Sequence, residues 1–180
     1  MAGATRAELL KILLAGAAAS SAAPAAALAG PAPGGLAARV ARLEARDEIH
    51  TLMLAYGRTL DARDFAGFEA LWATGAEYGP GQGRMSKGPS AIRAALEKAF
   101  ATNAAGVRDP NFHVFFNVMI WPVEGDRATA FSRSAFVAAN AEGKLEVVIA
   151  AHYDDAFVRD GGRWKFQRRV ITADRAAPLK

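Results

Sequence analysis

The 180-residue chain contains no cysteine. This absence excludes disulfide frameworks, thiolate zinc sites, iron–sulfur clusters and cysteine nucleophiles. Histidine is scarce too, because only His50, His113 and His152 occur and no two of them stand at a spacing typical of metal ligands. We therefore expect a protein that holds neither a metal nor another cofactor.

Long runs of like charge are also missing. Lysine and arginine total 22 against 18 acidic residues, a formal net charge of +4, yet no block of five or six basic residues occurs. Nucleic acid is therefore not an expected partner. The glycine-rich segment 79–83 neither follows a buried strand nor opens a helix, and no serine stands in a nucleophile-elbow context. Neither a phosphate-binding loop nor a hydrolase triad is predicted.

The N-terminal segment has the residue order of a secretory signal. Arg6 and Lys11 precede an apolar run, and small residues then lead to Ala27-Leu28-Ala29, a predicted cleavage site before Gly30. A transmembrane anchor is the alternative, but it needs about 20 strongly apolar residues, and alanine is too weakly apolar to serve. We expect a signal peptide over 1–29 and a periplasmic or secreted protein, with no membrane contact after cleavage.

The remaining sequence predicts one domain over 38–174, between a flexible leader at 30–37 and a tail at 175–180. Its first part is helical, because apolar residues recur at three- and four-residue spacing from Leu36 through Leu60, over about 25 residues.

Shorter elements follow this first helix. Asp64 can cap a short second helix that includes Trp72, and Gly88-Pro89 opens a third helix. Between them, segment 76–85 predicts a small irregular hairpin.

The sequence pattern changes to long β-prone runs after Asn111. Three glycine-containing turns, at 124–126, 142–144 and 160–162, separate these runs and predict four consecutive antiparallel strands. Strands of about a dozen residues must bend. The expected fold class is therefore α+β, with N-terminal helices packed on a long, strongly curved antiparallel sheet that encloses a pocket.

Side chains on the first long strand alternate between its two faces. His113 and Asn117 share one face, and two polar residues on an otherwise apolar strand favour a wet cavity wall, although a packed core histidine is the alternative. The other face carries Phe112, Val114, Phe116, Val118 and Ile120. Because helices of the same chain can cover only one face, we expect this second face to form a homodimer contact.

Three motifs occur in a recognisable order: Tyr56 through Asp64 (YGRTLDARD), His113-x-x-x-Asn117, and the run from Ala151 (AHYDD) into Gly162 (GRWKF). Together they resemble the SnoaL-like family of the NTF2-like superfamily over residues 38–174, which implies a cone-shaped fold. That superfamily holds polyketide cyclases, ketosteroid isomerases, dehydratases, a dehydrochlorinase and members with no known reaction. Fold does not settle function.

The resemblance implies a histidine base oriented by an aspartate, and His113 and Asp61 match these two positions. Physical chemistry agrees, because the negative end of a helix is an unfavourable place for Asp61 unless a partner compensates it. A carboxylate bound to one ring nitrogen fixes the tautomer and leaves the other nitrogen free to take a proton from carbon. Tyr56 would act as acid or oxyanion donor, or it simply completes the apolar stripe of its helix.

Other residues are candidate substrate binders. Arg169 resembles a pocket arginine of the dehydrochlorinase, and Arg133, flanked by apolar residues, needs a carboxylate partner or a ligand. Asn117, Trp72 and Tyr78 could line the cavity, although Trp72 also fits a core. The expected function is an exported, cofactor-free lyase or isomerase acting on a small apolar, polycyclic or aromatic molecule. The alternative is a non-catalytic ligand-binding or assembly module.

Overall fold

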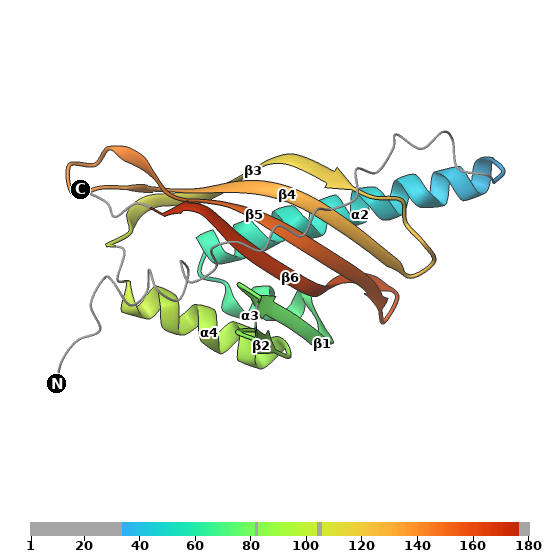
Figure 1. Cartoon of the computed structure of the whole chain (residues 1–180), viewed down its shortest axis with the longest axis horizontal. Helices are drawn as coiled ribbons and strands as arrows, with labels where there is room; N and C mark the ends of the chain where they lie inside the picture. The colour runs from blue at the N-terminus through green and yellow to red at the C-terminus, as the bar shows by residue number, and fades with distance from the viewer. Residues whose placement is uncertain (1–33, 82, 104–105, 177–180) are drawn as a thin grey trace.

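The computed structural model describes residues 34–81, 83–103 and 106–176 (Figure 1). The predicted signal peptide and most of the predicted leader and tail lie outside these residues, so they stay predictions. None of the helices in the described ranges combines the length and apolar character needed to cross a membrane.

The predicted first helix is α2 (Leu36–Asp61), whose N-terminal end extends beyond the sheet (Figure 1). Ile49, Met53, Tyr56 and Leu60 are buried at alternating spacings of four and three residues, so they form one stripe against the sheet. The second helix, α3 (Phe65–Ala70), follows at once. As predicted, Asp64 caps it, because the backbone N–H of Gly67 donates to Asp64 Oδ1 at 2.8 Å.

Two short strands precede the third helix, α4 (Pro89–Thr102). The first, β1 (Trp72–Gly79), pairs with β2 (Ser86–Lys87), which confirms a small hairpin in this region. The expectation that Trp72 belongs to the short helix is wrong. Trp72 begins β1 because it pairs with Phe166 in a parallel ladder with the last strand, a long-range contact with no local sequence signal.

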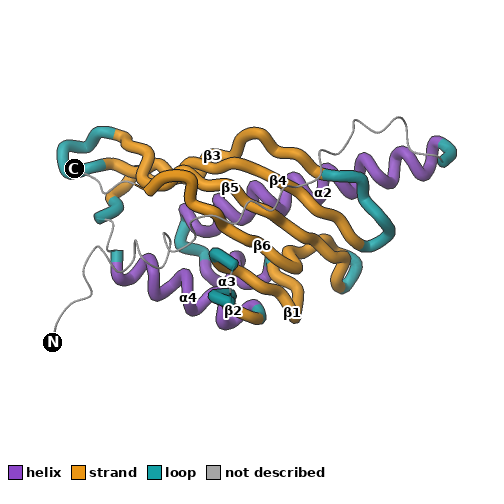
Figure 2. Tube along the Cα trace, in the orientation of Figure 1, coloured by secondary structure: helices purple, strands orange, loops and turns teal. Residues whose placement is uncertain are grey.

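Four long strands form the rest of the sheet: β3 (Arg108–Ile120), β4 (Arg127–Ala139), β5 (Leu145–Asp160) and β6 (Arg163–Ala176). They follow one another as antiparallel neighbours, as the three turns predict, and the full order is β2-β1-β6-β5-β4-β3 (Figure 2). The predicted α+β class with a curved sheet is confirmed, and the sheet is extended by β1 and β2. We call the side of β3 to β6 that packs on α2 the inner face and the opposite side the outer face.

A β-bulge in β3 changes which side chains reach each face. Asn117 has a φ of +50°, and the pairing with β4 jumps from Phe116 opposite Arg133 to Met119 opposite Phe131. The predicted alternation is therefore wrong beyond Phe116. Val118 and Ile120 turn inward and pack on the core, whereas Met119 is 54% exposed.

Candidate functional site

Asp61 and His113 are in direct contact where the end of α2 meets β3. The Nδ1 atom of His113 lies 2.6 Å from Asp61 Oδ1, and the backbone N–H of His113 donates to Asp61 Oδ2 at 3.0 Å. Both carboxylate oxygens of Asp61 thus bind His113, and this double contact fixes the imidazole relative to the end of α2. The contact compensates a negative charge that α2 alone would disfavour at its C-terminus.

The close approach of α2 and β3 depends on Gly57. A Cβ atom at this position would lie 2.9 Å from a ring carbon of Phe115 and 3.1 Å from Cβ of His113. A larger residue would force the Phe115 ring or the helix to shift, so glycine at this position permits the close approach that brings Asp61 to His113.

Aromatic rings surround the imidazole of His113. The ring of Phe136 is centred 4.7 Å away, and the ring of Tyr56 meets it edge-on at 6.1 Å. The His113 side chain keeps 9% of its surface exposed and that of Asp61 keeps 21%. The pair therefore lies in largely apolar surroundings with remaining access to solvent.

Two tyrosines connect α2 to β1 beside this pair. The hydroxyl oxygens of Tyr56 and Tyr78 lie 2.9 Å apart in a hydrogen bond. Burial raises the pKa of both phenols, and for Tyr56 the nearby phenols of Tyr78 and Tyr153 raise it further. Both hydroxyls therefore keep their protons at neutral pH and can donate hydrogen bonds.

A fully buried ion pair lies under the tyrosines. Arg169 donates from Nε and Nη2 to the two carboxylate oxygens of Asp155, each at 2.7 Å, and neither side chain has exposed surface. The guanidinium carbon lies 4.1 Å from the ring centre of Tyr56 and 4.3 Å from that of Tyr153. Burial lowers the pKa of the Arg169 guanidinium, but the adjacent carboxylate of Asp155 outweighs burial. The net shift of the guanidinium pKa is therefore upward.

The structure does not bring all predicted site residues together. Asp61, His113, Tyr56, Tyr78 and Arg169 gather on the inner side, and their functional roles stay predictions. Arg133 lies on the outer face, where it donates to Asp174 Oδ2 at 2.6 Å, and the bulge leaves Asn117 exposed instead of beside His113. Trp72 is 2% exposed and packs in the core.

The sequence interpretation missed Asp155 and Tyr153. Both lie in the AHYDD segment, but which of two adjacent aspartates points inward depends on strand register. Across the described ranges, no group of three or more His, Asp or Glu side chains is placed to hold a metal ion.

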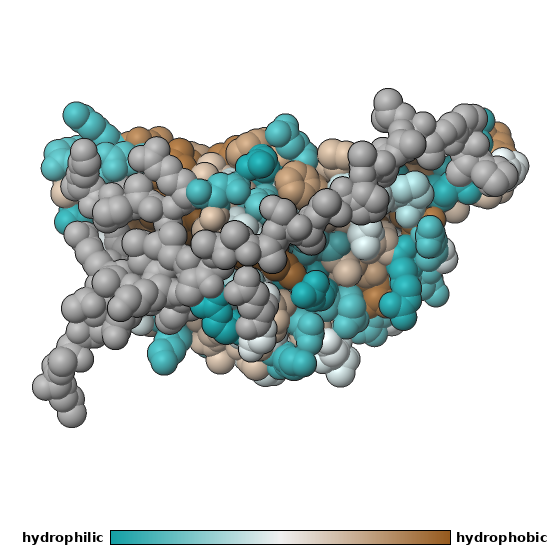
Figure 3. Space-filling view, in the orientation of Figure 1, coloured by the Kyte–Doolittle hydropathy of each residue, from teal (hydrophilic) through white to brown (hydrophobic). Residues whose placement is uncertain are grey.

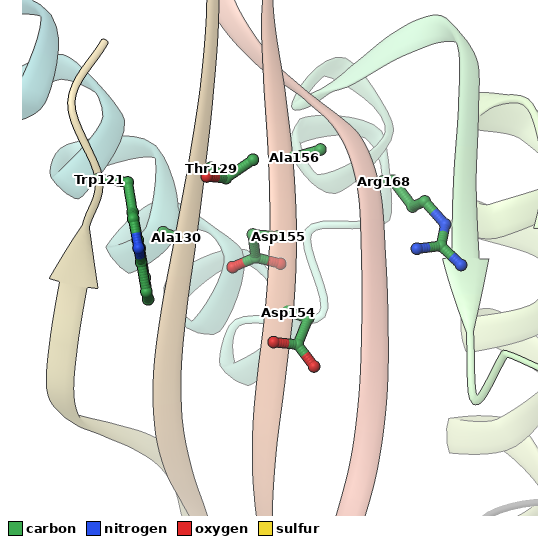
Figure 4. Close-up of a pocket in the computed structure, with 7 residues that line it drawn as sticks. All are labelled: Trp121, Thr129, Ala130, Asp154, Asp155, Ala156 and Arg168. Carbon is green, nitrogen blue, oxygen red and sulfur yellow. The ribbon is translucent and has the colours of Figure 1, made fainter. Parts of the chain in front are cut away.

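A cavity of about 370 Å³ lies on the outer face (Figure 4). Trp121, Thr129, Asp154, Ala156 and Arg168 are among the residues that line it. The lining includes neither His113 nor Asp61, so the sheet separates this cavity from the histidine–aspartate pair.

The chain matches the family model of the SnoaL-like domain over residues 41–170, well over half of its length. No curated protein sequence matches it significantly. Among solved structures, an NTF2-like protein with a cystatin-like fold from Novosphingobium aromaticivorans is 28% identical, with a TM-score of 0.69 over 79% of this chain and 90% of that one.

Two further solved structures are similar. Aln2 from a Streptomyces species is 25% identical, with a TM-score of 0.64 over 73% of this chain and 91% of that one. A hexachlorocyclohexane dehydrochlorinase, LinA type 2, is 21% identical, with a TM-score of 0.63 over 79% and 93% of the two chains. The family match and these folds agree with the element order found here, and the chain belongs to the SnoaL-like family of NTF2-like proteins.

Proposed function

We propose that this protein is a cofactor-free lyase or isomerase that removes a carbon-bound proton from a small apolar or aromatic molecule. The observation that carries the proposal is the double contact of the Asp61 carboxylate with the ring and the backbone of His113. The dehydrochlorinase among the similar structures supports the proposal only at the level of the fold.

In the proposed reaction, His113 is the base. Its Nδ1–H donates to Asp61, so Nε2 carries the lone pair, and Nε2 has no hydrogen-bond partner among the described residues. When Nε2 takes a proton, the adjacent carboxylate stabilises the imidazolium that forms. The aromatic surroundings favour an apolar substrate, and the hydroxyl pair of Tyr56 and Tyr78 supplies a hydrogen-bond donor for its oxygen.

The elimination of 5-nitrobenzisoxazole tests the proposal without knowledge of the natural substrate. In this reaction a base removes the ring C–H proton, the N–O bond breaks, and a coloured cyanophenolate forms. We expect purified protein to accelerate it by about 100-fold or more over the same concentration of free imidazole, with saturation by the probe, in the presence of EDTA.

The matched control is His152→Gln. His152 also contacts an aspartate, Asp174, at 2.9 Å, but the pair lies on the outer face. This variant should keep the full rate. A wild-type rate equal to that of free imidazole would contradict the enzyme proposal and leave a non-catalytic ligand-binding module.

We further propose that the protein is a homodimer through its outer face. Val114, Phe116 and Met119 are 41%, 42% and 54% exposed, and they lie side by side along β3. Figure 3 shows hydrophobic side chains along the edge of the molecule where β3 runs in Figure 1. An apolar face of this kind is typical of a contact with a second copy.

Phe116→Glu should dissociate the dimer, because it would place unpaired carboxylates in an apolar contact. Light scattering at micromolar concentration measures the result. Leu43→Glu is the control, since Leu43 is an exposed apolar residue of α2 and does not belong to the sheet. A wild-type monomer, or a Phe116→Glu variant that still dimerises, would refute the proposal.

A further inference from the structure

Both members of the histidine–aspartate pair lie on weakly held parts of their elements. Asp61 is the last residue of α2, and the last turn of a helix leaves carbonyl groups without an intrahelical partner. His113 lies in the first half of β3, an edge strand whose pairing with β4 shifts in register between Arg108 and Asn111. A link between the end of α2 and this part of β3 would therefore keep Asp61 against His113.

Arg63 has a backbone conformation that usually belongs to glycine. Its φ is +57°, and its backbone N–H donates to the carbonyl oxygen of Leu60 at 3.1 Å, just after the end of α2. The other non-glycine residues with positive φ in the described ranges are Asn103 and Asn117, and asparagine tolerates this conformation better than arginine does. An arginine at this position indicates that its side chain makes contacts that offset the strain.

The side chain of Arg63 joins three elements. Its Nη1 donates to the carbonyl oxygen of Leu60 at 2.7 Å, and its Nη2 donates to Asn111 Oδ1 on β3 at 3.1 Å. Asp109 accepts from the amide nitrogen of Asn111, which turns the amide oxygen toward Arg63. The guanidinium carbon also lies 4.0 Å from the ring centre of Phe100 on α4. One side chain thus contacts the end of α2, the start of β3 and α4.

This link runs beside the histidine–aspartate contact. Arg63 follows Asp61 by two residues, and Asn111 precedes His113 by two residues on the same face of β3. We infer that Arg63 is a positioning residue that keeps Asp61 against His113. The inference rests on the proposed function, in which His113 is the base, and it gives a role to a residue outside the pair.

Nuclear magnetic resonance tests the geometry without any substrate. The Nδ1 proton of His113 lies between two atoms 2.6 Å apart, so it should give a strongly downfield signal. Arg63→Gly should broaden or abolish this signal, whereas the turn is kept because glycine adopts the same φ without strain. Arg159→Met is the matched control and should leave the signal unchanged. Arg159 also donates to a backbone carbonyl and lies over an aromatic ring, that of Trp164, at 5.1 Å.

The kinetic effect should fall on kcat alone. We expect Arg63→Gly to lower kcat for 5-nitrobenzisoxazole by about tenfold or more, because a displaced Asp61 no longer orients the imidazole. KM should change by less than about twofold, since Arg63 acts through Asp61 and not on the substrate. Asn111→Ala breaks the same link from the β3 side, so it should change the signal and kcat in the same direction. The double variant should be no slower than Arg63→Gly alone.

The two measurements separate a positioning role from the alternatives. An unchanged signal in Arg63→Gly would overturn the inference, and a lower kcat beside it would show that Arg63 acts on the substrate instead. A wild-type protein without the downfield signal, or an equal loss of signal after Arg159→Met, would overturn it as well. If Arg63→Gly fails to fold, as judged by circular dichroism, Asn111→Ala decides the same question. Absence of wild-type turnover would remove the proposed function alone, because the signal still shows whether Arg63 holds the pair.

Discussion

Replacing Asp155 by Asn is expected to lower the free energy of unfolding by about 3 to 5 kcal/mol. The substitution keeps the size of the side chain, so the packing is unchanged, but it leaves the fully buried guanidinium of Arg169 without a counter-charge. Urea denaturation measures the change. An unaltered slope of the free energy of unfolding against urea concentration would show that the folded and unfolded states of the variant resemble those of the wild type.

Asp174→Asn is the matched control for this prediction. It removes the carboxylate partner of Arg133, whose side chain is 42% exposed, so we expect a loss of no more than about 1 kcal/mol. The double variant Asp155→Asn with Arg169→Met should be more stable than Asp155→Asn alone, because no unpaired charge remains. Equal losses for Asp155→Asn and Asp174→Asn would contradict the interpretation of the buried pair.

The second large effect concerns catalysis. His113→Gln should lower kcat for 5-nitrobenzisoxazole by about 10² to 10⁴-fold, because glutamine has no basic nitrogen. Asp61→Asn should lower kcat by a slightly smaller factor, because the imidazole remains but its imidazolium loses the carboxylate 2.6 Å away.

The two dyad substitutions should also be non-additive. A variant with both changes should be no slower than His113→Gln alone, because Asp61 acts only through His113. Circular dichroism of each variant checks that the fold is kept. Losses that multiply would show that Asp61 has a separate role, and a fully active His113→Gln variant would end the assignment of the base.

Much of the fold could be predicted because its signals are local. The apolar stripe through Ile49, Met53 and Tyr56 follows the helical period, Asp64 is a preferred cap, and glycines such as Gly125 and Gly143 adopt the positive φ that the hairpin turns require. The order and class of the elements follow from these signals.

Features that depend on distant contacts could not be predicted in the same way. Counted straight from the turn at Gly161-Gly162, Asp155 would face Arg168. A register shift between Ala156 and Phe157 instead places it opposite Arg169. One unpaired residue thus decides which arginine is buried.

The same distinction between local signals and distant contacts applies to the candidate site. The contact of Asp61 with His113 could be anticipated, because the helix end disfavours an unpartnered carboxylate and the resemblance marks both residues. The place of Asn117 could not, because the pattern of alternation contains no signal for a bulge. Asparagine tolerates positive φ better than most residues, and this tolerance is the only feature of the residue itself that is compatible with a bulge.

The bulge at Asn117 also bears on whether the edge of the sheet can pair with another chain. In the sheet order, β3 is an edge strand, and a straight edge strand offers a row of free N–H and C=O groups on which another chain can add. The register shift interrupts the regular spacing of these groups midway along β3. Open-ended, edge-to-edge polymerisation is therefore disfavoured at this border, so the exposed apolar side chains of β3 do not lie beside a regular template for fibrils.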